Sequence, residues 1–409
     1  MRSLAPRLLA LLLSAGPLAC AAGDDSRSIV RDSAGIGIVE NRATDAGWQD
    51  GRPWSATIDL TIGADTGGEM FQFGRIGDLA VLPSGDIAVI DQLAGQVRVF
   101  DRRGAFLRTI GRPGRGPGEL SRSTNAVLPV AGDSLLLPDP DERRITVFAP
   151  DGTAGRVILV PPQPRSQSWA RTAGGRLLMR GLRISRGESG FEFHDALIAL
   201  APDGAVADTL LEFDYAKSDL GGPGRLRVPL IVNSPSWALL ADGRVAWTAL
   251  DRNYVMVHDS SGRPVRRITH VQWAARPITP DDKAAMVELM RAKLRMIGGD
   301  PSFADSPQTE APPAFPAITA VKAGPDGTIW VQRMGSVATI DPMAINAPDR
   351  AEFFGGDTWD VLDGDGRWLG TIELPGRFRI MRITDDAIYG AARDDDGVER
   401  VLRLRLRRG

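Results

Sequence analysis

The amino-acid sequence predicts an all-β fold: a six-bladed β-propeller whose last blade is completed by an N-terminal strand, with one helix inserted between blades four and five. The first observation behind this prediction is a repeat of four short apolar segments separated by turns. The second is a glycine at two of the turns in each complete copy, as tight hairpins require. Four-stranded units that recur about every 40–50 residues are typical of propellers.

The clearest copy of the repeat runs from Gly74 to Gly111. The glycines of the first turn are Gly85, Gly132, Gly175, Gly243 and Gly327, and those of the second turn are Gly104, Gly152, Gly204, Gly262 and Gly366. In the three compact copies, the first, second and fourth, these two glycines lie 19, 20 and 19 residues apart. The regular spacing indicates that five copies are complete blades.

A sixth copy is incomplete, because residues 377–409 supply three strands before the sequence stops. The segment from Trp54 to Gly63 ends in Thr-Ile-Gly, as does the fourth strand of the first copy. We therefore predict that this N-terminal segment is the fourth strand of blade six. A blade built from both ends of the chain closes the ring and removes two exposed sheet edges.

The stretch "GDLAVLPSGDIAVIDQLAGQVRVFDRRGAFLRTIG", followed by "GPGEL", resembles bacterial six-bladed propellers of the NHL-repeat type. The match is strongest from Gly74 to Leu120 and continues more weakly to the C-terminus. The resemblance implies the fold. Members of this group bind proteins, RNA or sugars, and some relatives are enzymes, so the resemblance does not imply one function.

The first 20 residues have the outline of a secretory signal peptide: Arg2 and Arg7 precede an apolar run that is too short to span a bilayer. Cys20, the only cysteine, ends this segment and resembles the lipidated cysteine of bacterial lipoproteins, although Pro17 departs from the preferred motif. The alternative is ordinary signal cleavage near Cys20. We expect an exported protein, lipid-anchored to the outer membrane and facing the periplasm or the cell surface, or otherwise periplasmic or secreted. Residues 21–36 are expected to be a tether and residues 37–409 the propeller.

The formal net charge of −2 gives no broad basic field, which makes nucleic acid an unsuitable partner. We expect a monomer. The segment Gly111–Leu120, "GRPGRGPGEL", lacks the Lys-Ser/Thr that a phosphate-binding P-loop needs, and is expected to connect blades one and two. The three histidines, His194, His258 and His270, are far apart in the sequence and give little material for a metal site or a catalytic triad.

Four long segments interrupt the repeat, and the strand order of a propeller places all four on one face, here called the top face. They are residues 182–195, 215–235, 272–316 and 335–357. The third contains a predicted helix, capped by Thr279, started by Pro280 and ended by Gly298. Its apolar stripe comprises Met286, Val287, Met290, Leu294 and Ile297. This stripe either packs on the propeller or forms a lid or partner-binding surface.

One charged residue in each blade directly follows or ends the second strand, near the predicted top of the channel. These candidate ligand-binding residues are Asp91, Asp139, Arg180, Asp251, Arg333 and Arg393. Such a mixed rim is suited to a zwitterionic or polar ligand, or to a divalent ion on its acidic side. The competing interpretation is that each aspartate caps its own loop or pairs with an arginine of a neighbouring blade.

The sequence favours a non-catalytic binding module without a cofactor, which binds a protein, peptide or saccharide through its top face. The alternative is a hydrolase or lactonase-like enzyme with a divalent cation in the central channel. Lactonase-type propellers hold such an ion with glutamate, asparagine and aspartate, and Asp91, Asp139 and Asp251 are the residues that could mimic them.

Overall fold

The computed structural model describes residues 27–48, 51–64, 68–186, 191–215, 221–222, 225–342, 345, 351–394 and 396–409. The predicted signal peptide and Cys20 lie outside these residues. Within them, no helix is both long and apolar enough to cross a membrane.

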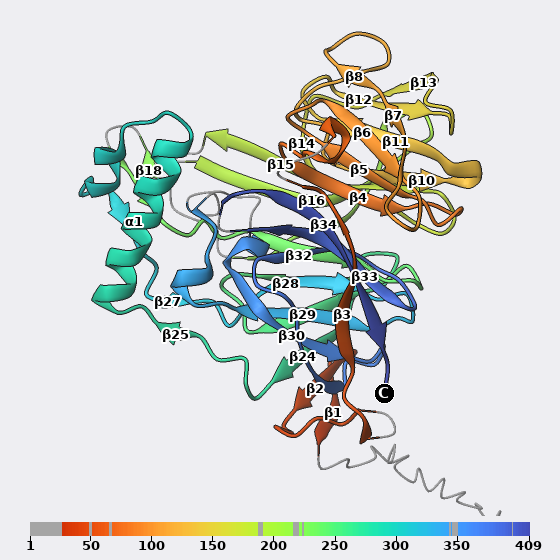
Figure 1. Cartoon of the computed structure of the whole chain (residues 1–409). Coiled ribbons are helices and arrows are strands. Elements are labelled where there is room, and N and C mark those ends of the chain that lie inside the picture. The colour runs from red at the N-terminus through yellow and green to blue at the C-terminus, as the bar shows by residue number, and fades with distance from the viewer. Residues whose placement is uncertain are drawn as a thin grey trace, which may run out of the picture.

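The chain forms six blades of four antiparallel strands each, arranged as a six-bladed β-propeller, which confirms the predicted fold (Figure 1). Blades one to three comprise β4 (Ile76–Val81), β5 (Ile87–Asp91), β6 (Gln96–Phe100) and β7 (Phe106–Ile110); β10 (Leu128–Val130), β11 (Ser134–Asp139), β12 (Arg144–Phe148) and β13 (Ala154–Leu159); and β14 (Arg165–Arg171), β15 (Leu177–Arg186), β16 (Phe191–Leu200) and β17 (Val206–Glu212). Blades four to six comprise β21 (Pro235–Leu239), β22 (Val245–Ala249), β23 (Tyr254–His258) and β24 (Pro264–His270); β28 (Ile318–Ala323), β29 (Ile329–Met334), β30 (Gly355–Leu362) and β31 (Trp368–Glu373); and β32 (Phe378–Ile383), β33 (Ala387–Arg393), β34 (Glu399–Arg407) and β3 (Ser55–Ile62).

Strand β3 is the outer strand of blade six, as the sequence predicts. It pairs antiparallel with β34, from Ser55 opposite Arg407 to Ile62 opposite Val401. Its Asp59 carboxylate accepts hydrogen bonds from two arginines of β34, at 2.8 and 3.1 Å. The last blade therefore contains strands from both ends of the described chain, and the ring is closed.

The glycines of the second turns serve two purposes. At Gly262 the backbone has a φ of +80°, a value that residues with a side chain rarely adopt. A Cβ atom at this position would also lie 1.6 Å from the carbonyl oxygen of Leu210, in the outer strand of the preceding blade. The turn glycine thus allows one blade to approach the next, which is a packing requirement in addition to a conformational one.

A hairpin of β1 (Ser28–Ser33) and β2 (Ile36–Asn41) extends blade four, and this the sequence did not predict. Strand β2 pairs parallel with β24, and its buried Asn41 donates to the carbonyl oxygens of Thr269 (3.1 Å) and Gly366 (3.0 Å). Residues 28–36, which we expected to belong to a flexible tether, are therefore part of the folded domain.

Three of the four long segments pack together on the top face. The predicted helix is present as α1 (Pro280–Met296), with Thr279 and Asp282 forming a capping box. Its buried Met286 and Met290 share one apolar cluster with Leu230, from the second segment, and Phe354, from the fourth. The stripe thus packs on the propeller. Figure 1 shows α1 at one side of the ring, beside β18 (Gly221–Gly222), β25 (Arg276–Pro277) and β27 (Ala314–Phe315). The same segments also contain β19 (Arg225–Leu226), β20 (Val228–Pro229), β26 (Thr309–Glu310) and the 3-10 helix η4 (Pro301–Asp305).

The connector "GRPGRGPGEL" contains two short paired strands, β8 (Arg112–Pro113) and β9 (Glu119–Leu120), and leads from blade one to blade two. The Glu119 carboxylate accepts from the Gly116 N–H at 2.8 Å and from Arg112 Nε at 3.1 Å. The N–H of Gly116 and the charge of Arg112 hold the pKa of Glu119 below its usual value. This glutamate therefore stabilises the connector itself.

Candidate functional site

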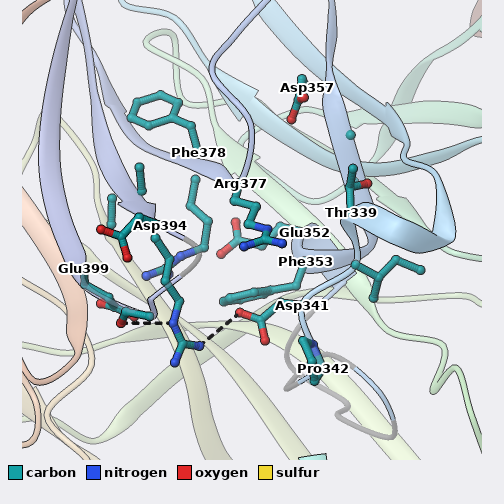
Figure 2. Close-up of a pocket in the computed structure, with 18 of the residues that line it drawn as sticks. Thr339, Asp341, Pro342, Glu352, Phe353, Asp357, Arg377, Phe378, Asp394 and Glu399 are labelled. Carbon is teal, nitrogen blue, oxygen red and sulfur yellow. Dashed lines mark hydrogen bonds and ion pairs between the residues drawn. The ribbon is translucent and has the colours of Figure 1, made fainter. Parts of the chain in front are cut away.

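A cavity of about 390 Å³ lies between blades five and six on the top face (Figure 2). Blade five contributes residues of β29 and β30, and blade six contributes residues of β32, β33 and β34. The segment 335–357 adds further wall, and Met296 in the last turn of α1 also borders the cavity. Segments that interrupt the repeat therefore build much of this site. We call it the top-face cavity.

The described ends of the segment 335–357 are held in place by apolar packing and by a hydrogen bond. It includes η5 (Val337–Thr339) and η7 (Ala351–Phe354), and buried Ile340 and Phe354 anchor it in the apolar cluster below α1. The segment leads into β30, which begins at Gly355 close to β29. A Cβ atom on Gly355 would lie 1.9 Å from the Gln332 side chain of β29. Gln332 Nε2 donates to the carbonyl oxygen of Gly356 at 3.1 Å, which fixes this close approach.

The lining of the top-face cavity is rich in charge of both signs. Its carboxylates are Asp341, Glu352, Asp357, Asp394, Asp396 and Glu399, and its arginines are Arg377, Arg379 and Arg393. Two of these acids are neutralised from outside the cavity: Lys322 pairs with Glu352 at 2.8 Å, and Arg400 pairs with Asp394. The rest of the lining therefore offers both cationic and anionic groups to a ligand.

The arginines and acids of the lining differ in how many hydrogen bonds and ion pairs they already make within the protein. Arg393 lies 3.7 Å from Asp341 and donates to the Gly397 carbonyl, while Arg379 donates to the Ile76 carbonyl and stacks over a phenylalanine ring. The half-buried carboxylate of Asp357 has no hydrogen bond or ion pair among the described residues. Figure 2 shows Asp357 at one end of the group, apart from Asp394 and Glu399. Asp357 and the exposed Asp396 are thus the lining acids whose side chains have no partner among the described residues, and Asp357 is the less exposed of the two.

Two of the predicted rim residues, Asp91 and Asp139, stabilise their own connectors. The Asp91 carboxylate accepts from four backbone N–H groups, at 3.0 to 3.2 Å, and pairs with buried Arg98 at 3.3 Å. The Asp139 carboxylate accepts from the N–H and hydroxyl of Ser121 and from the hydroxyl of Ser123. Both side chains are buried. A cation or ligand at either carboxylate would have to displace these donors.

Two rim arginines form ion pairs with buried aspartates inside their own blades. Arg180 makes a bidentate pair with Asp195 of β16, at 2.9 and 2.6 Å, and the Tyr215 hydroxyl also donates to Asp195. Burial raises the pKa of Tyr215 well above its usual value, and the charge of Asp195 adds to this. Arg333 makes a bidentate pair with Asp360 of β30, with both distances 2.7 Å.

The six rim residues do not line one common cavity. Arg393 lines the top-face cavity, and Arg180 lines the central channel, a separate cavity of about 580 Å³. Asp251 is exposed and lies 3.9 Å from Arg252, and Asp91, Asp139 and Arg333 line neither cavity. Within the described part of the chain, no group of three or more histidine, cysteine, aspartate or glutamate residues is arranged to hold a metal ion.

A set of polar residues around the channel, which was not predicted from the sequence, links successive blades. One residue in each of blades one to four hydrogen-bonds to the next blade. The pairs are Asp78 with the Val127 N–H (2.9 Å), Asn125 with the Gln167 carbonyl (3.2 Å), Ser168 with Trp237 Nε1 (2.8 Å) and Ser236 with the Val321 N–H (3.0 Å). Each first-named residue lies seven positions before its first-turn glycine, so the repeat itself contained the signal.

Comparison with known proteins agrees with this architecture. A family model described as "6-bladed beta-propeller" matches residues 67–149, which include blade one and three strands of blade two. The fold is a six-bladed β-propeller. A protein from Bacteroides fragilis NCTC 9343, named as an exported protein, is similar at a TM-score of 0.50 and 11% identity, over 90% of this chain and 99% of that chain.

Two enzymes are among the more distant structural matches. A virginiamycin B lyase from Staphylococcus aureus with quinupristin is 10% identical, over 87% of this chain and 100% of that chain, with a TM-score of 0.45. A gluconolactonase from Xanthomonas campestris is 13% identical, over 87% and 99%, with a TM-score of 0.42. No curated protein sequence matches this chain. At these identities the likeness concerns the fold alone.

Proposed function

We propose that this protein is an exported, lipid-anchored binding module that holds a small polar ligand carrying both positive and negative charge in the top-face cavity. The observation that supports this function is the lining of that cavity, where carboxylates and arginines line one common volume. Its volume of about 390 Å³ is within the range of small-molecule sites and suits a ligand of about tripeptide size.

We infer complementary roles for the two kinds of charge in the lining. Asp357 receives the ammonium group, because its carboxylate has no partner among the described residues. Arg377 and Arg393 receive a carboxylate or hydroxyl group, since a guanidinium offers several donors in one plane. Phe353 contributes an aromatic surface. A free peptide or an acidic amino sugar has these features, whereas a neutral sugar lacks the ionic ones.

Replacement of Asp357 by asparagine tests this assignment without disturbing a visible structural contact. We expect tripeptides and acidic amino sugars to raise the thermal unfolding temperature, and neutral disaccharides to leave it unchanged. Asp357→Asn is expected to weaken binding by about tenfold or more, because a hydrogen bond to a charged group contributes about 1.5–3 kcal/mol. The readout is a thermal-shift titration of the full mature chain.

Glu212→Gln is the matched control, because Glu212 is an exposed acid on the outer strand of blade three. It should bind like the unmodified protein. Equal ligand affinity in the Asp357→Asn and Glu212→Gln variants would show that Asp357 does not contribute to ligand binding. A complete lack of response to ligands with both charges would contradict the proposed function.

The proposed anchor rests on Cys20, which ends the signal-like segment. We expect the unmodified protein to sediment with membranes, and the Cys20→Ser variant to move to the soluble exported fraction, because the serine hydroxyl does not receive the thioether-linked lipid. Fractionation followed by immunoblotting measures this. Unchanged membrane association of the Cys20→Ser variant would show that Cys20 is not the lipid anchor. This result would not affect the proposal for the ligand in the top-face cavity.

A further inference from the structure

The C-terminal end of α1 exposes large apolar side chains. Met296 is 51% exposed and Ile297 is 56% exposed, and Phe303 in the following 3-10 helix η4 is 42% exposed. By contrast, Met286 and Met290 are buried and hold the helix on the propeller. Exposed apolar side chains that gather in one region are typical of interaction surfaces.

Met296 connects this end of α1 to the top-face cavity. Among the described residues that line the cavity, it is the only large apolar side chain that is exposed. Ile340 and Phe378, which also line it, are buried, and Phe353 is partly buried. Met296 is therefore the large apolar lining residue with the greatest exposed fraction.

The helix end that carries Met296 is held on the wall of the cavity. Lys293 Nζ donates to the carbonyl oxygen of Ile345, which ties the last turns of α1 to the segment 335–357. The helix also lies against η5 of this segment. On its other neighbour, η4, Asp305 pairs with Arg291 of α1. The exposed methionine side chain thus has a defined place beside the ionic lining.

We infer that the ligand of the top-face cavity carries a bulky apolar side chain in addition to its two charges, and that Met296 determines this specificity. The inference rests on the proposed function, because it concerns the same cavity. It narrows the ligand to a short peptide with an apolar residue, since an acidic amino sugar carries both charges without such a side chain.

The chemistry of the two kinds of wall supports this class of ligand. Asp357 of β30 and Met296 of α1 belong to different elements that line one cavity. A peptide presents its charged termini and its side chains at separate positions, so that one molecule serves both elements. The methionine side chain is unbranched and adapts to apolar groups of different shape, and their burial together favours binding.

The test compares triglycine with the three tripeptides in which one glycine is replaced by leucine, by calorimetric titration of the full mature chain. We expect at least one leucine peptide to bind about fivefold or more tightly than triglycine, because burial of its methyl and methylene groups favours binding. Met296→Ser should remove this preference and leave the affinity for triglycine unchanged. Met296→Leu, which keeps an apolar side chain, should retain the preference.

Met70→Ser is the matched control, because Met70 is also an exposed methionine but lies in the 3-10 helix η2 (Glu69–Phe71) and does not line the cavity. It should keep the full preference for leucine. Phe303→Ser should keep it as well, since Phe303 does not line the cavity either. A loss of the preference in this variant would place the apolar side chain outside the cavity and contradict the inference.

Equal affinity for triglycine and all three leucine peptides would also overturn the inference, as would the same leucine preference in the Met296→Ser and Met70→Ser variants. In either case the proposed function would stand if triglycine still bound and if Asp357→Asn still weakened its binding. A lack of binding by all four peptides would overturn the inference. The proposed function would fail with it only if the acidic amino sugars also gave no response.

Discussion

Replacement of Asp360 by alanine is expected to lower the free energy of unfolding by about 3–5 kcal/mol, because it removes the carboxylate partner of half-buried Arg333 and the acceptor of two buried indole N–H groups. The Asp360 carboxylate is fully buried in blade five. It accepts from Trp273 Nε1 at 2.7 Å, from Trp368 Nε1 at 2.9 Å and from both Nε and Nη2 of Arg333 at 2.7 Å. Trp273 directly follows blade four, so this acid also joins two blades.

The pKa of Asp360 agrees with a structural role for the ionised form. Burial alone would raise it, but the hydrogen bonds and charge of Arg333, together with the indole donor of Trp273, hold it below its usual value. Stability from this group is therefore fully present above the ordinary pKa of aspartate. It is lost as the pH falls through the lowered value in the folded protein.

The measurement is denaturant unfolding of Asp360→Ala beside Asp357→Ala, which changes the same strand three residues earlier. Asp357→Ala should alter the unfolding free energy by less than about 0.5 kcal/mol, since the side chain has no partner among the described residues. A double variant with Arg333→Met should recover part of the loss by removing the unpaired charge. A loss below about 1 kcal/mol in Asp360→Ala would contradict this account of the cluster.

Removal of strand β3 should have the largest effect of all, because it opens the ring. A chain that begins at residue 64 exposes the edge of β34 and the buried side chains of Leu402, Leu404 and Leu406. Unpaired edges and exposed apolar surface promote aggregation. We expect this variant to yield no cooperatively folding monomer. Size-exclusion chromatography and thermal unfolding measure the outcome.

A chain that begins at residue 51 is the matched control, because it lacks the β1–β2 hairpin but keeps β3. It should remain a folded monomer with reduced stability, since it loses the buried Val39 and Asn41. A synthetic peptide of residues 51–64 should restore folding of the shorter chain when supplied separately. If the chain from residue 64 unfolds at the same temperature as the chain from residue 51, closure by β3 does not stabilise the ring.

Much of this architecture could be predicted from the sequence, because the repeat makes each element visible several times. The closing strand was found from the shared Thr-Ile-Gly, and α1 from Thr279, Pro280 and Gly298. The β1–β2 hairpin was missed, because Arg31 and Asp32 give its first strand the composition of a tether. Its turn is tight, with Ala34 and Gly35 both at positive φ, and only the glycine marks it in the sequence.

The site could be predicted less well, for physical reasons. Repeat position places Asp91 and Arg393 at corresponding points of their blades, but it does not show what each side chain contacts. Asp91 is engaged by backbone N–H groups, whereas Arg393 lines a cavity. That cavity depends on segment 335–357, which occurs once and has no repeat to reveal it. The partner acids Asp195 and Asp360 lie on the third strands, 15 and 27 residues after their arginines.

The most direct test of the proposed function is calorimetry of the top-face cavity with one ligand and its charge-blocked analogues. The ligand is the most stabilising compound of the thermal-shift panel, compared with its N-acetylated form and its form with the carboxylate converted to an amide. We predict that the ligand with both charges binds, and that blocking either charge weakens the affinity by about tenfold or more. Equal affinity of all three forms would contradict recognition by Asp357 and the arginines.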